Sequence, residues 1–302
     1  MPEQKLSPLI WNILACPHCS IPLERKNDGA FCPSCGSLFT STDSGALDLR
    51  PQKRLSRLIS FTVNTSAFPS DPSVFGPLTE NREPEVGFSG TRVPYHLSRE
   101  FMSWFPKAQT RESLAMDLGC GDGVHREFCE SCGFEYVGLD YNSEQASILG
   151  NAHALPFKDN SFEFILSVAV LEHIRYPFLM AAEVGRVLRP GGKFIGTAAF
   201  LEPFHGDSYY HHSHLGLLNT LLSGGFKVER ISPVRNWTGL TALGQMGLFP
   251  RMPAILTRAI LAPLYLAQRA WWGAARLITR HDPGTDRTFR NAGAFVFIAV
   301  KE

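Results

Sequence analysis

The sequence lacks the features that would mark a secreted or membrane-spanning protein. Residues 1–14 contain no basic stretch followed by a long apolar run and a small-residue cleavage site, so we expect no signal peptide. The most apolar segment, 254–278, contains three arginines and a proline, which argues against a spanning helix. We find no internal repeat. These absences predict a cytoplasmic protein and leave peripheral contact with a membrane open.

Net charge is also low, at +1 for the whole chain at pH 7. The charges are unevenly placed, because residues 61–231 carry 13 Lys/Arg and 20 Asp/Glu whereas residues 232–302 carry 9 and 3. The basic C-terminal region suits an anionic surface such as phospholipid or nucleic acid, although arginines that only solubilise helices would give the same count. At 302 residues the chain has room for one large and one small domain.

Cysteine is sparse but organised, since four of the seven form the pattern C-x2-C-x12-C-x2-C. These four are Cys16, Cys19, Cys32 and Cys35. Each C-x-x-C turn directs two thiolates toward one centre, and two such turns complete the tetrahedron that zinc prefers. Four protein ligands leave no open position, so we predict a structural zinc in a ribbon module over residues 1–51. Residues 52–90, rich in proline, serine and asparagine, are predicted to be a linker.

A glycine-rich pattern follows in the second third of the chain, where Asp117 begins the run Asp-Leu-Gly-Cys-Gly-Asp-Gly. The glycines are Gly119, Gly121 and Gly123. Glycines at this spacing let the backbone approach a ligand closely at a helix N-terminus, and a carboxylate about twenty residues on, Asp140, is placed to bind a ribose diol. Val124 occupies the last glycine position of the dinucleotide pattern G-x-G-x-x-G. The run instead resembles the signature of S-adenosylmethionine-dependent methyltransferases of the Rossmann-like class.

Short apolar strands alternate with helices from residue 113 onward, as in βαβ units on a parallel sheet. The expected strands are 113–119, 136–140, 162–168, 193–199, 226–231 and 294–300, with a helix over 178–188. Asn151 comes only eleven residues after Asp140, so the helix between them must be abbreviated. With the resemblance, the pattern predicts an α/β, Rossmann-like, doubly wound seven-stranded sheet over residues 91–302, with a helical insertion at about 234–290.

The segments NAHALPFKDNSFEFILSVAVLEHI and EVGRVLRPGGKF, between residues 151 and 193, closely resemble small-molecule methyltransferases of the ubiquinone and menaquinone type and their cell-envelope relatives. The resemblance implies S-adenosylmethionine as cofactor, with Asp140 holding both ribose hydroxyls. The family usually has Asp-Ala before ALPF. Here Asn151 would accept the adenine amino hydrogen bond and Ala152 would offer its backbone N–H.

The same resemblance assigns the methionine end of the cofactor. Gly119 and Gly121 would line it, and Ser167 would lie beneath it. Asp117 would orient the loop or the cofactor's amino group, with a buried structural role as the alternative.

Histidines supply candidate general bases for an oxygen or nitrogen acceptor that starts protonated. His173 follows the fourth strand of this fold, expected over residues 162–168, at the edge of the sheet that faces substrate in this topology. A second group, which includes His205 and His211, follows the fifth strand of this fold, expected over residues 193–199. It is interpreted as a loop over the acceptor, with solvated loop residues or a metal site as alternatives.

The insertion before the last strand contains the apolar segment 254–278. On a helix its arginines, Arg258, Arg269 and Arg276, fall within about 20° of one another. Pro263 is expected to kink or split the helix. Three interpretations stay open: a lid over the substrate, a peripheral membrane contact, or a homodimer interface.

Residues 13–15 and 45–49, beside the cysteine turns, are similar to small zinc-ribbon activators of methyltransferases, which usually act as separate subunits on tRNA, rRNA or protein methyltransferases. A large-subunit rRNA guanine methyltransferase family also carries an N-terminal zinc module. We predict a methyltransferase acting on a small, lipophilic or lipid-linked acceptor. An RNA methyltransferase is disfavoured by the acidic central region and by the lack of an Asn/Asp-Pro-Pro-Tyr/Phe motif. A non-catalytic cofactor-binding regulator is a further alternative.

Overall fold

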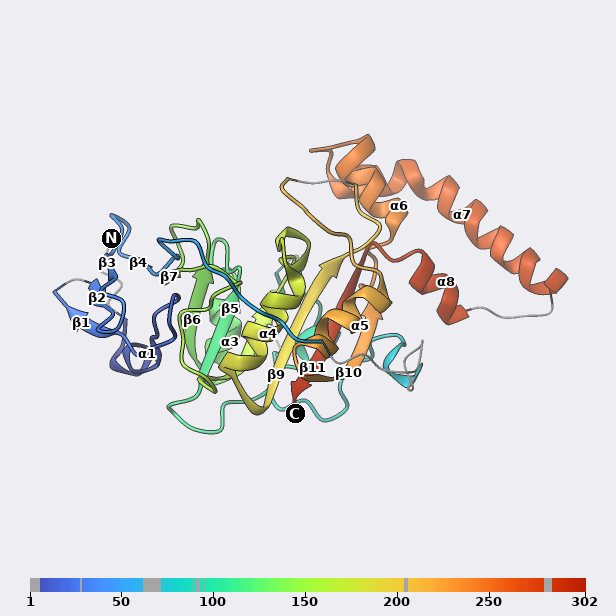
Figure 1. The fold of residues 1–302 in the computed structure, drawn as a ribbon. Coiled ribbons are helices and arrows are strands. Elements are labelled where there is room, and N and C mark those ends of the chain that lie inside the picture. Colours follow the sequence, from blue (N-terminus) through green and yellow to red (C-terminus); the bar gives the residue numbers. More distant parts are fainter. Residues whose placement is uncertain are drawn as a thin grey trace.

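The computed structural model describes residues 6–27, 29–61, 72–88, 90, 93–94, 96–203, 206–279 and 284–302. It contains a small N-terminal ribbon, a large sheet with helices on both faces, and a helical insertion before the last strand (Figure 1).

The N-terminal ribbon consists of one short helix and three short antiparallel strands. Its elements are α1 (Pro8–Ile13), β1 (Glu24–Lys26), β2 (Gly29–Phe31) and β3 (Leu38–Phe39). Helix α1 begins at a true N-cap, because the Ser7 hydroxyl accepts a hydrogen bond from the backbone N–H of Ile10. A Cβ at Gly29 would lie 2.1 Å from the carbonyl oxygen of Phe39, so the close pairing of β2 and β3 requires glycine there.

The large sheet has eight strands in the order β10-β11-β9-β8-β5-β6-β7-β4. They are β4 (Leu47–Asp48), β5 (Leu114–Leu118), β6 (Glu135–Asp140), β7 (Ile148–Leu149), β8 (Phe162–Ser167), β9 (Leu188–Ala199), β10 (Phe226–Pro233) and β11 (Ala294–Lys301). Strand β11 runs antiparallel to both of its neighbours, and the other pairs are parallel. Residues after 91 supply seven strands, as the sequence predicts, and the ribbon adds the eighth.

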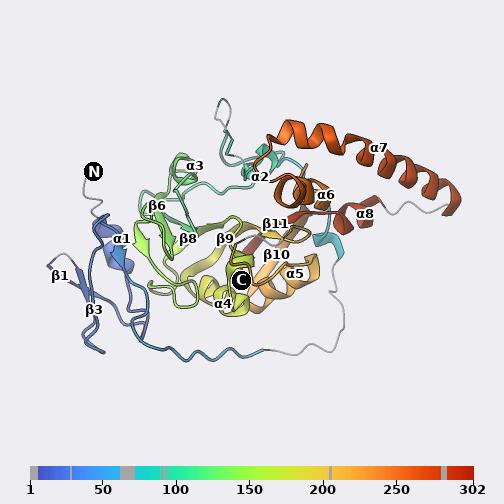
Figure 2. The ribbon, with the colours of Figure 1, turned by 90° about the horizontal axis from the view of Figure 1, so that it is seen from above.

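Helices cover both faces of the sheet, which makes the fold doubly wound (Figure 2). The helical segments are η1 (Pro72–Val74), α2 (Arg99–Met102), α3 (Arg126–Ser131), η2 (Leu171–His173), α4 (Pro177–Val187) and α5 (His214–Ser223). Helices α4 and α5 lie on one face, and α2 and α3 lie on the other. The buried side chains of α4 include Met180, Val184 and Val187, whose spacing of four and three residues places them on one side of the helix.

The structure differs from the sequence prediction between β6 and β8. The sequence predicts an abbreviated helix after Asp140, but the described residues 141–150 contain no helix and form the two-residue strand β7. The turn is made by Asp140 itself, whose Oδ1 accepts hydrogen bonds from the backbone N–H groups of Asn142 and Ser143. Strand β9 also begins five residues earlier than predicted, at Leu188, directly after α4.

The ribbon is joined to the large sheet by backbone pairing and by a shared core. Strand β4 pairs in parallel with β7, and the N–H of Ala15 donates to the carbonyl of Pro156 over 2.9 Å. Leu14, Leu49 and Phe157 are fully buried and belong to one apolar core that includes residues of both parts. Burial of an apolar side chain of this size contributes about 1.5–3 kcal/mol, so ribbon and sheet stabilise each other.

The described parts of the predicted linker 52–90 lie against the large domain. Residues 52–61 cross the face that carries α4, where the rings of Phe61 and Phe178 meet edge to face at 5.6 Å (Figure 2). Farther along, the N–H of Leu78 donates to the Ser232 hydroxyl over 2.6 Å. The segment therefore connects the two opposite edges of the sheet.

The insertion before β11 is helical, as predicted. It comprises α6 (Gly239–Ala242), the π-helical segment η3 (Leu243–Leu248), α7 (Ala254–Thr279) and α8 (Gly284–Arg290). Pro263 is expected from the sequence to kink or split the long helix, and the split is wrong because α7 continues through the proline. Pro263 is exposed, so water can bond the carbonyl that has lost its helical partner. In the described part of the chain, every helix is too short or too polar to cross a bilayer.

Candidate functional site

Four loops meet where the parallel strands β5, β6, β8 and β9 end, the edge at which open α/β sheets bind ligands. The loops are residues 119–123, 140–143 and 168–173, with the described residues 200–203 and 206–212. Hydrogen bonds join neighbouring loops: the N–H of Gly121 donates to Asp140 Oδ2 over 3.1 Å, and the N–H of Tyr209 donates to the carbonyl of Glu172 over 2.6 Å.

The glycine loop adopts backbone conformations that side chains disfavour. Gly119, Gly121 and Gly123 have φ values of 76°, 49° and 71°, in the left-handed region. A Cβ at Gly119 would lie 2.4 Å from Val170 Cγ2, so glycine is also required for packing against the loop after β8. At Gly121 and Gly123 an added Cβ would meet no atom within 4 Å. The loop therefore presents bare backbone to open space, as a close-binding ligand requires.

Asp140 lies at the end of β6, beside this loop, and is partly exposed. Its Oδ1 binds the N–H groups of the turn, and its Oδ2 accepts the N–H of Gly121. The Ser143 hydroxyl donates back to the carbonyl of Gly121 over 2.5 Å. A carboxylate fixed in this way keeps a charged, partly exposed oxygen pair at the rim of the glycine loop, the arrangement that suits a ribose diol.

Asp117 is fully buried beneath the loop. Its Oδ2 accepts the Tyr136 hydroxyl over 3.0 Å and lies 3.3 Å from Nδ1 of His125, the residue that precedes α3. Burial, followed by the charge of Asp117, raises the pKa of Tyr136, so the phenol stays protonated and donates. This geometry favours the loop-orienting and structural roles that the sequence left open for Asp117.

Asn151 begins the tight turn after β7, with Ala152 next to it. Its Oδ1 accepts from the N–H of His153 over 3.0 Å and lies 2.7 Å from His153 Nδ1. His153 Nε2 in turn accepts the N–H of Tyr176 over 3.1 Å. The sequence did not single out His153, because a contact with the start of α4 cannot be read from local spacing.

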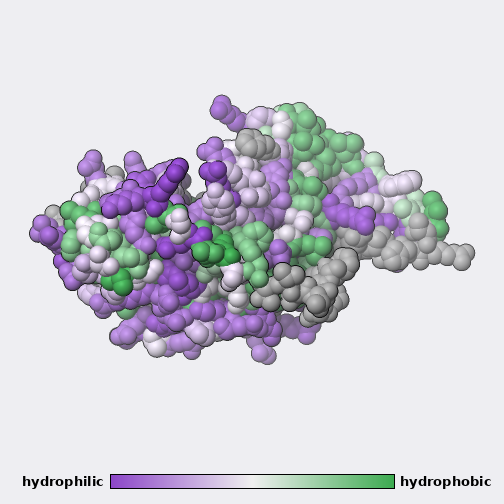
Figure 3. Space-filling model, viewed as in Figure 1, coloured by the Kyte–Doolittle hydropathy of each residue, from purple (hydrophilic) through white to green (hydrophobic). Residues whose placement is uncertain are grey.

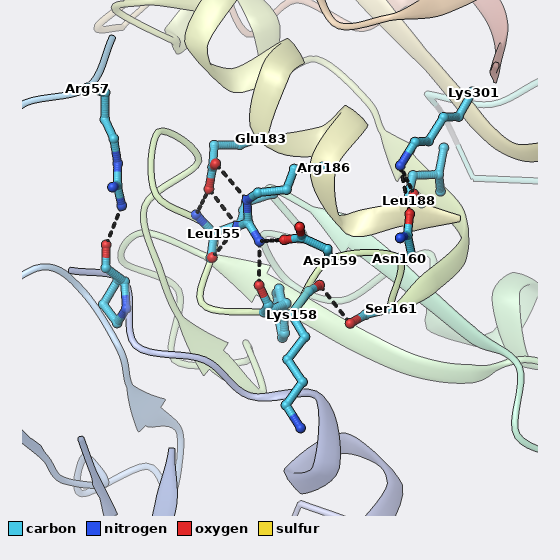
Figure 4. Close-up of polar contacts among 12 residues, drawn as sticks. Arg57, Leu155, Lys158, Asp159, Asn160, Ser161, Glu183, Arg186, Leu188 and Lys301 are labelled. Carbon is cyan, nitrogen blue, oxygen red and sulfur yellow. Dashed lines mark hydrogen bonds and ion pairs between the residues drawn. The ribbon is translucent and has the colours of Figure 1, made fainter. Parts of the chain in front are cut away.

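A partly buried set of hydrogen bonds from α4 holds the chain that follows this turn (Figure 4). Arg186 donates to the carbonyls of Leu155 and Phe157 over 2.9 and 2.7 Å. Glu183 accepts from Arg186 over 2.8 Å and from the N–H of Leu155 over 2.8 Å. Asp159 completes the set with an ion pair of 2.9 Å to Arg186. The segments ALPF and E-x-x-R are therefore joined by hydrogen bonds in the folded chain.

Ser167 ends β8 in the floor of the site and is fully buried. Its hydroxyl has no hydrogen-bond partner among the residues that the structure describes. A buried hydroxyl without a partner costs free energy, so a ligand that supplies one would gain from it. The place of Ser167 beneath a cofactor stays a prediction.

The candidate bases occupy different environments. His173 is half-buried at the end of η2, whereas His211 is exposed. His205 lies outside the described residues. The neighbouring His212, which the sequence did not favour, is buried, and its N–H donates to the carbonyl of Ala199 at the end of β9 over 2.7 Å.

We predict that His212 makes the protein less stable in mild acid. Burial, aided by the charge of His211, lowers the pKa of His212 to about 4, whereas an unfolded chain takes up the proton near 6.5. Stability is therefore complete above pH 6.5 and falls as the pH drops toward 4. The expected loss is about 2 kcal/mol at pH 5. Urea unfolding at pH 7.5 and 5 should show this loss in the parent chain, most of it in His211→Gln, where burial of His212 still acts, and a clearly smaller loss in His212→Gln. Equal pH dependence in both variants would contradict the prediction.

The four ribbon cysteines gather as the spacing predicts. Their sulfur atoms all lie within 4.8 Å of one another, with 3.7 Å between Cys16 and Cys35 and 3.4 Å between Cys19 and Cys32. Zinc–sulfur bonds of about 2.3 Å require sulfur separations of about 3.8 Å, so the cluster fits a tetrahedral zinc. Burial raises the pKa of Cys16 to about 12, and a hydrogen bond with Ser37 lowers that of Cys35 to about 6.

The ribbon also reaches the rim of the glycine-loop site. Arg50, two residues after β4, donates to the carbonyl of Tyr141 over 3.1 Å, and its guanidinium lies 5.5 Å from the centre of the Tyr141 ring. Asp48 holds Arg50 in place through a 2.6 Å ion pair. Tyr141 directly follows Asp140. This contact joins residues 91 positions apart, so no local sequence pattern predicts it.

Comparison with known proteins gives consistent matches. Residues 116–196 match the family model described as a methyltransferase domain. A protein of Encephalitozoon cuniculi named as a methyltransferase is 36% identical over 181 residues, covering 47% of this chain and 82% of that protein. One from Mycolicibacterium smegmatis, named as an S-adenosylmethionine-dependent methyltransferase, is 28% identical over 150 residues, covering 42% and 57%.

Two further matches have other names. The human mitochondrial arginine-hydroxylase NDUFAF5 is 28% identical over 199 residues, covering 61% of this chain and 50% of that protein. Among solved structures, the complex of the Haloferax volcanii Trm112 methyltransferase activator with a methyltransferase matches with a TM-score of 0.46 and 17% identity, covering 68% of this chain and 89% of that one.

Proposed function

The chain belongs to the class I S-adenosylmethionine-dependent methyltransferases, and from this premise we propose that its acceptor is a small lipophilic or lipid-linked molecule. Bound S-adenosylmethionine supplies the methyl group from a sulfonium, so the leaving group needs no acid. Most of the rate then comes from holding the acceptor in line with the methyl group, and the site's own residues must provide that alignment.

In this proposal, different residues at the sheet edge bind different parts of the cofactor. Gly119, Gly121 and the orphan hydroxyl of Ser167 hold the methionine end. Asp140 holds the ribose hydroxyls. The turn formed by Asn151 and Ala152 faces the adenine, and because His153 occupies the Asn151 oxygen, adenine binding there requires that contact to be shared.

The observation that carries the acceptor class is an apolar surface next to the end of β9. Leu201, Leu243 and Leu248 are 42%, 45% and 55% exposed. They belong to segments in close contact, because a Cβ at Gly239 would lie 2.9 Å from Leu201 and one at Gly247 would lie 3.4 Å from Pro203. Exposed apolar side chains beside a reaction site favour a substrate that is itself apolar.

His173 is the proposed base, because it ends the loop whose Val170 packs on Gly119 and is half-buried. We expect His173→Ala to lower kcat at least 100-fold while the Kd of the cofactor changes less than about 2-fold. Turnover assays and calorimetry on the same preparations separate the two effects. His211→Ala, which replaces an exposed histidine in the neighbouring loop, is the variant measured beside it in the same assays. Unchanged turnover in His173→Ala would remove His173 from the mechanism.

The four-cysteine cluster is proposed to hold a structural zinc that keeps the ribbon folded against β7. The fit of the sulfur positions supports this assignment. Because four thiolates fill the coordination sphere, the metal would take no part in methyl transfer.

One partition experiment tests the acceptor proposal. Purified protein and methyl-labelled S-adenosylmethionine are incubated with host extract, and label is counted in lipid, aqueous small-molecule, RNA and protein fractions. We expect label in the organic phase, absent with Asp140→Ala. Label in RNA would overturn the proposal and recast the ribbon as an RNA-docking module. Cofactor binding with no label in any fraction would favour a non-catalytic regulator.

A further inference from the structure

The side of helix α7 that contacts the protein carries three of its uncharged polar residues, Thr257, Tyr265 and Gln268, together with Leu261. Thr257 and Leu261 are buried. The half-buried Tyr265 contacts Thr241 through its hydroxyl, and Gln268 donates to Asn291 over 3.0 Å. At 100° per residue these four positions fall within about 80° of one another. An ordinary surface helix buries its apolar side, so α7 is turned the opposite way.

The apolar side of α7 faces outward along the whole helix. Its most exposed apolar side chains are Ile255, Leu256, Ile260, Leu264, Leu266, Trp271, Leu277 and Ile278, which are 49–81% exposed. At about 1.5 Å per residue the helix is about 39 Å long, so this surface is far larger than a single exposed leucine. Figure 3 shows hydrophobic atoms gathered over the region of α6 and α7. A surface of this size requires a covering partner.

The charges on α7 indicate what that partner is. The helix contains Arg258, Arg269 and Arg276 and no Asp or Glu. The arginines lie in one row, about 40–60° from the first residue of the helix, between the packed side and the apolar side. A second copy of this helix would offer the arginine row no carboxylate. Anionic phosphates above an acyl layer match both the row of cations and the apolar side at once.

We propose that α7 lies in the surface of an anionic lipid bilayer, with its apolar side in the acyl boundary and its arginines at the headgroup phosphates. Trp271 sits on the apolar side, where an indole suits the interface. A helix of this composition lies on a membrane without crossing it, which agrees with the absence of a spanning helix in the described residues.

This placement also explains how a lipophilic acceptor would reach the site, an extension that rests on the proposed function. The insertion lies on the side of the sheet where β9 ends (Figure 1). Its segment η3 packs against the start of α7, since a Cβ at Gly244 would lie 2.4 Å from Leu261. The exposed Leu243 and Leu248 then continue the apolar surface of α7 toward the end of β9. A molecule dissolved in the bilayer would enter without crossing water.

Vesicle flotation of the full-length chain tests the membrane contact without measuring methyl transfer. Vesicles of phosphatidylcholine alone are compared with vesicles in which about one lipid in three is phosphatidylglycerol. We expect the protein to float with the anionic vesicles. Arg258→Gln with Arg269→Gln should weaken binding roughly 30-fold, from about 5-fold per arginine. Leu266→Glu with Leu277→Glu should weaken it at least about 100-fold.

Leu222→Glu is the matched control, because Leu222 is a 50% exposed leucine on α5, away from the insertion. It should float like the parent chain. All variants should keep the cofactor Kd of the parent, which shows that they are folded. No flotation of the parent chain with anionic vesicles would overturn the proposal. A different result would also overturn it: the parent chain sediments as a dimer and binds no lipid, and the double variant Leu266→Glu with Leu277→Glu sediments as a monomer.

The two proposals fail in distinguishable ways. Label in the organic phase with no flotation leaves the lipophilic acceptor standing and removes the membrane contact. Flotation with label only in RNA leaves the membrane contact standing and removes the lipophilic acceptor.

Discussion

Asp140→Ala is expected to weaken S-adenosylmethionine binding about 100-fold or more. The carboxylate is fixed at the rim of the glycine loop by three backbone N–H groups and is the one proposed ligand of the ribose hydroxyls. Hydrogen bonds to a charged group contribute about 1.5–3 kcal/mol each, and two of them account for a factor of about 100. Calorimetric titration with S-adenosylmethionine or S-adenosylhomocysteine gives the change directly.

A loss of affinity could also come from a disturbed loop, and a deoxyribose analogue separates the two causes. The parent chain should bind 2′-deoxy S-adenosylhomocysteine clearly more weakly than S-adenosylhomocysteine, whereas Asp140→Ala should bind the two about equally. Glu144→Ala removes an exposed carboxylate four residues along and should leave both affinities unchanged. If Asp140→Ala still prefers the hydroxylated ligand as strongly as the parent does, Asp140 does not bind the ribose.

Removing the ribbon metal is expected to have the second large effect. Cys32→Ser should abolish binding of one zinc per chain and unfold the ribbon, because a module with three short strands has too little core to fold alone. Leu14 and Leu49 would then leave the shared core, which costs about 4 kcal/mol and lowers Tm by about 10 °C. Metal analysis and a thermal scan measure the two effects.

The metal should also influence the cofactor, although it lies outside the site. Unfolding of the ribbon removes Arg50 from the carbonyl of Tyr141, next to Asp140, so we expect the cofactor Kd to rise roughly 10-fold, as for one lost charged hydrogen bond. Cys129→Ser is the control, because Cys129 is a buried thiol outside the cluster. It should lower Tm and keep the zinc. A parent chain purified without zinc, or Cys32→Ser with full zinc content, would contradict the prediction.

Local sequence was sufficient for the parts of this protein whose geometry depends on near neighbours. The spacing of the cysteines predicted a cluster that the structure forms, because each C-x-x-C turn positions its own two sulfur atoms. The glycine loop was equally readable, since Gly119, Gly121 and Gly123 all adopt the left-handed backbone that glycine permits. Short continuous apolar segments predicted six of the strands of the large domain, because a strand buried on both faces needs apolar residues throughout.

Short or shared elements were not readable in this way. Strand β7 has two residues, too few for a periodic pattern, and it exists because β6 and β4 pair with its two sides. The roles of neighbouring histidines were equally hidden, because His211 and His212 have the same chemistry and only the packing after β9 exposes one and buries the other.

The sequence by itself determined that residues 254–278 form an apolar helical segment with one row of arginines, and the structure showed that this helix continues through Pro263. Only the tertiary structure decided which side of it meets the protein. Tyr265 and Gln268 find hydrogen-bond partners on α6 and beside α8, and those contacts turn the leucines outward. The helical period follows from the backbone alone, but its rotation is fixed by contacts with residues that lie tens of positions away along the chain.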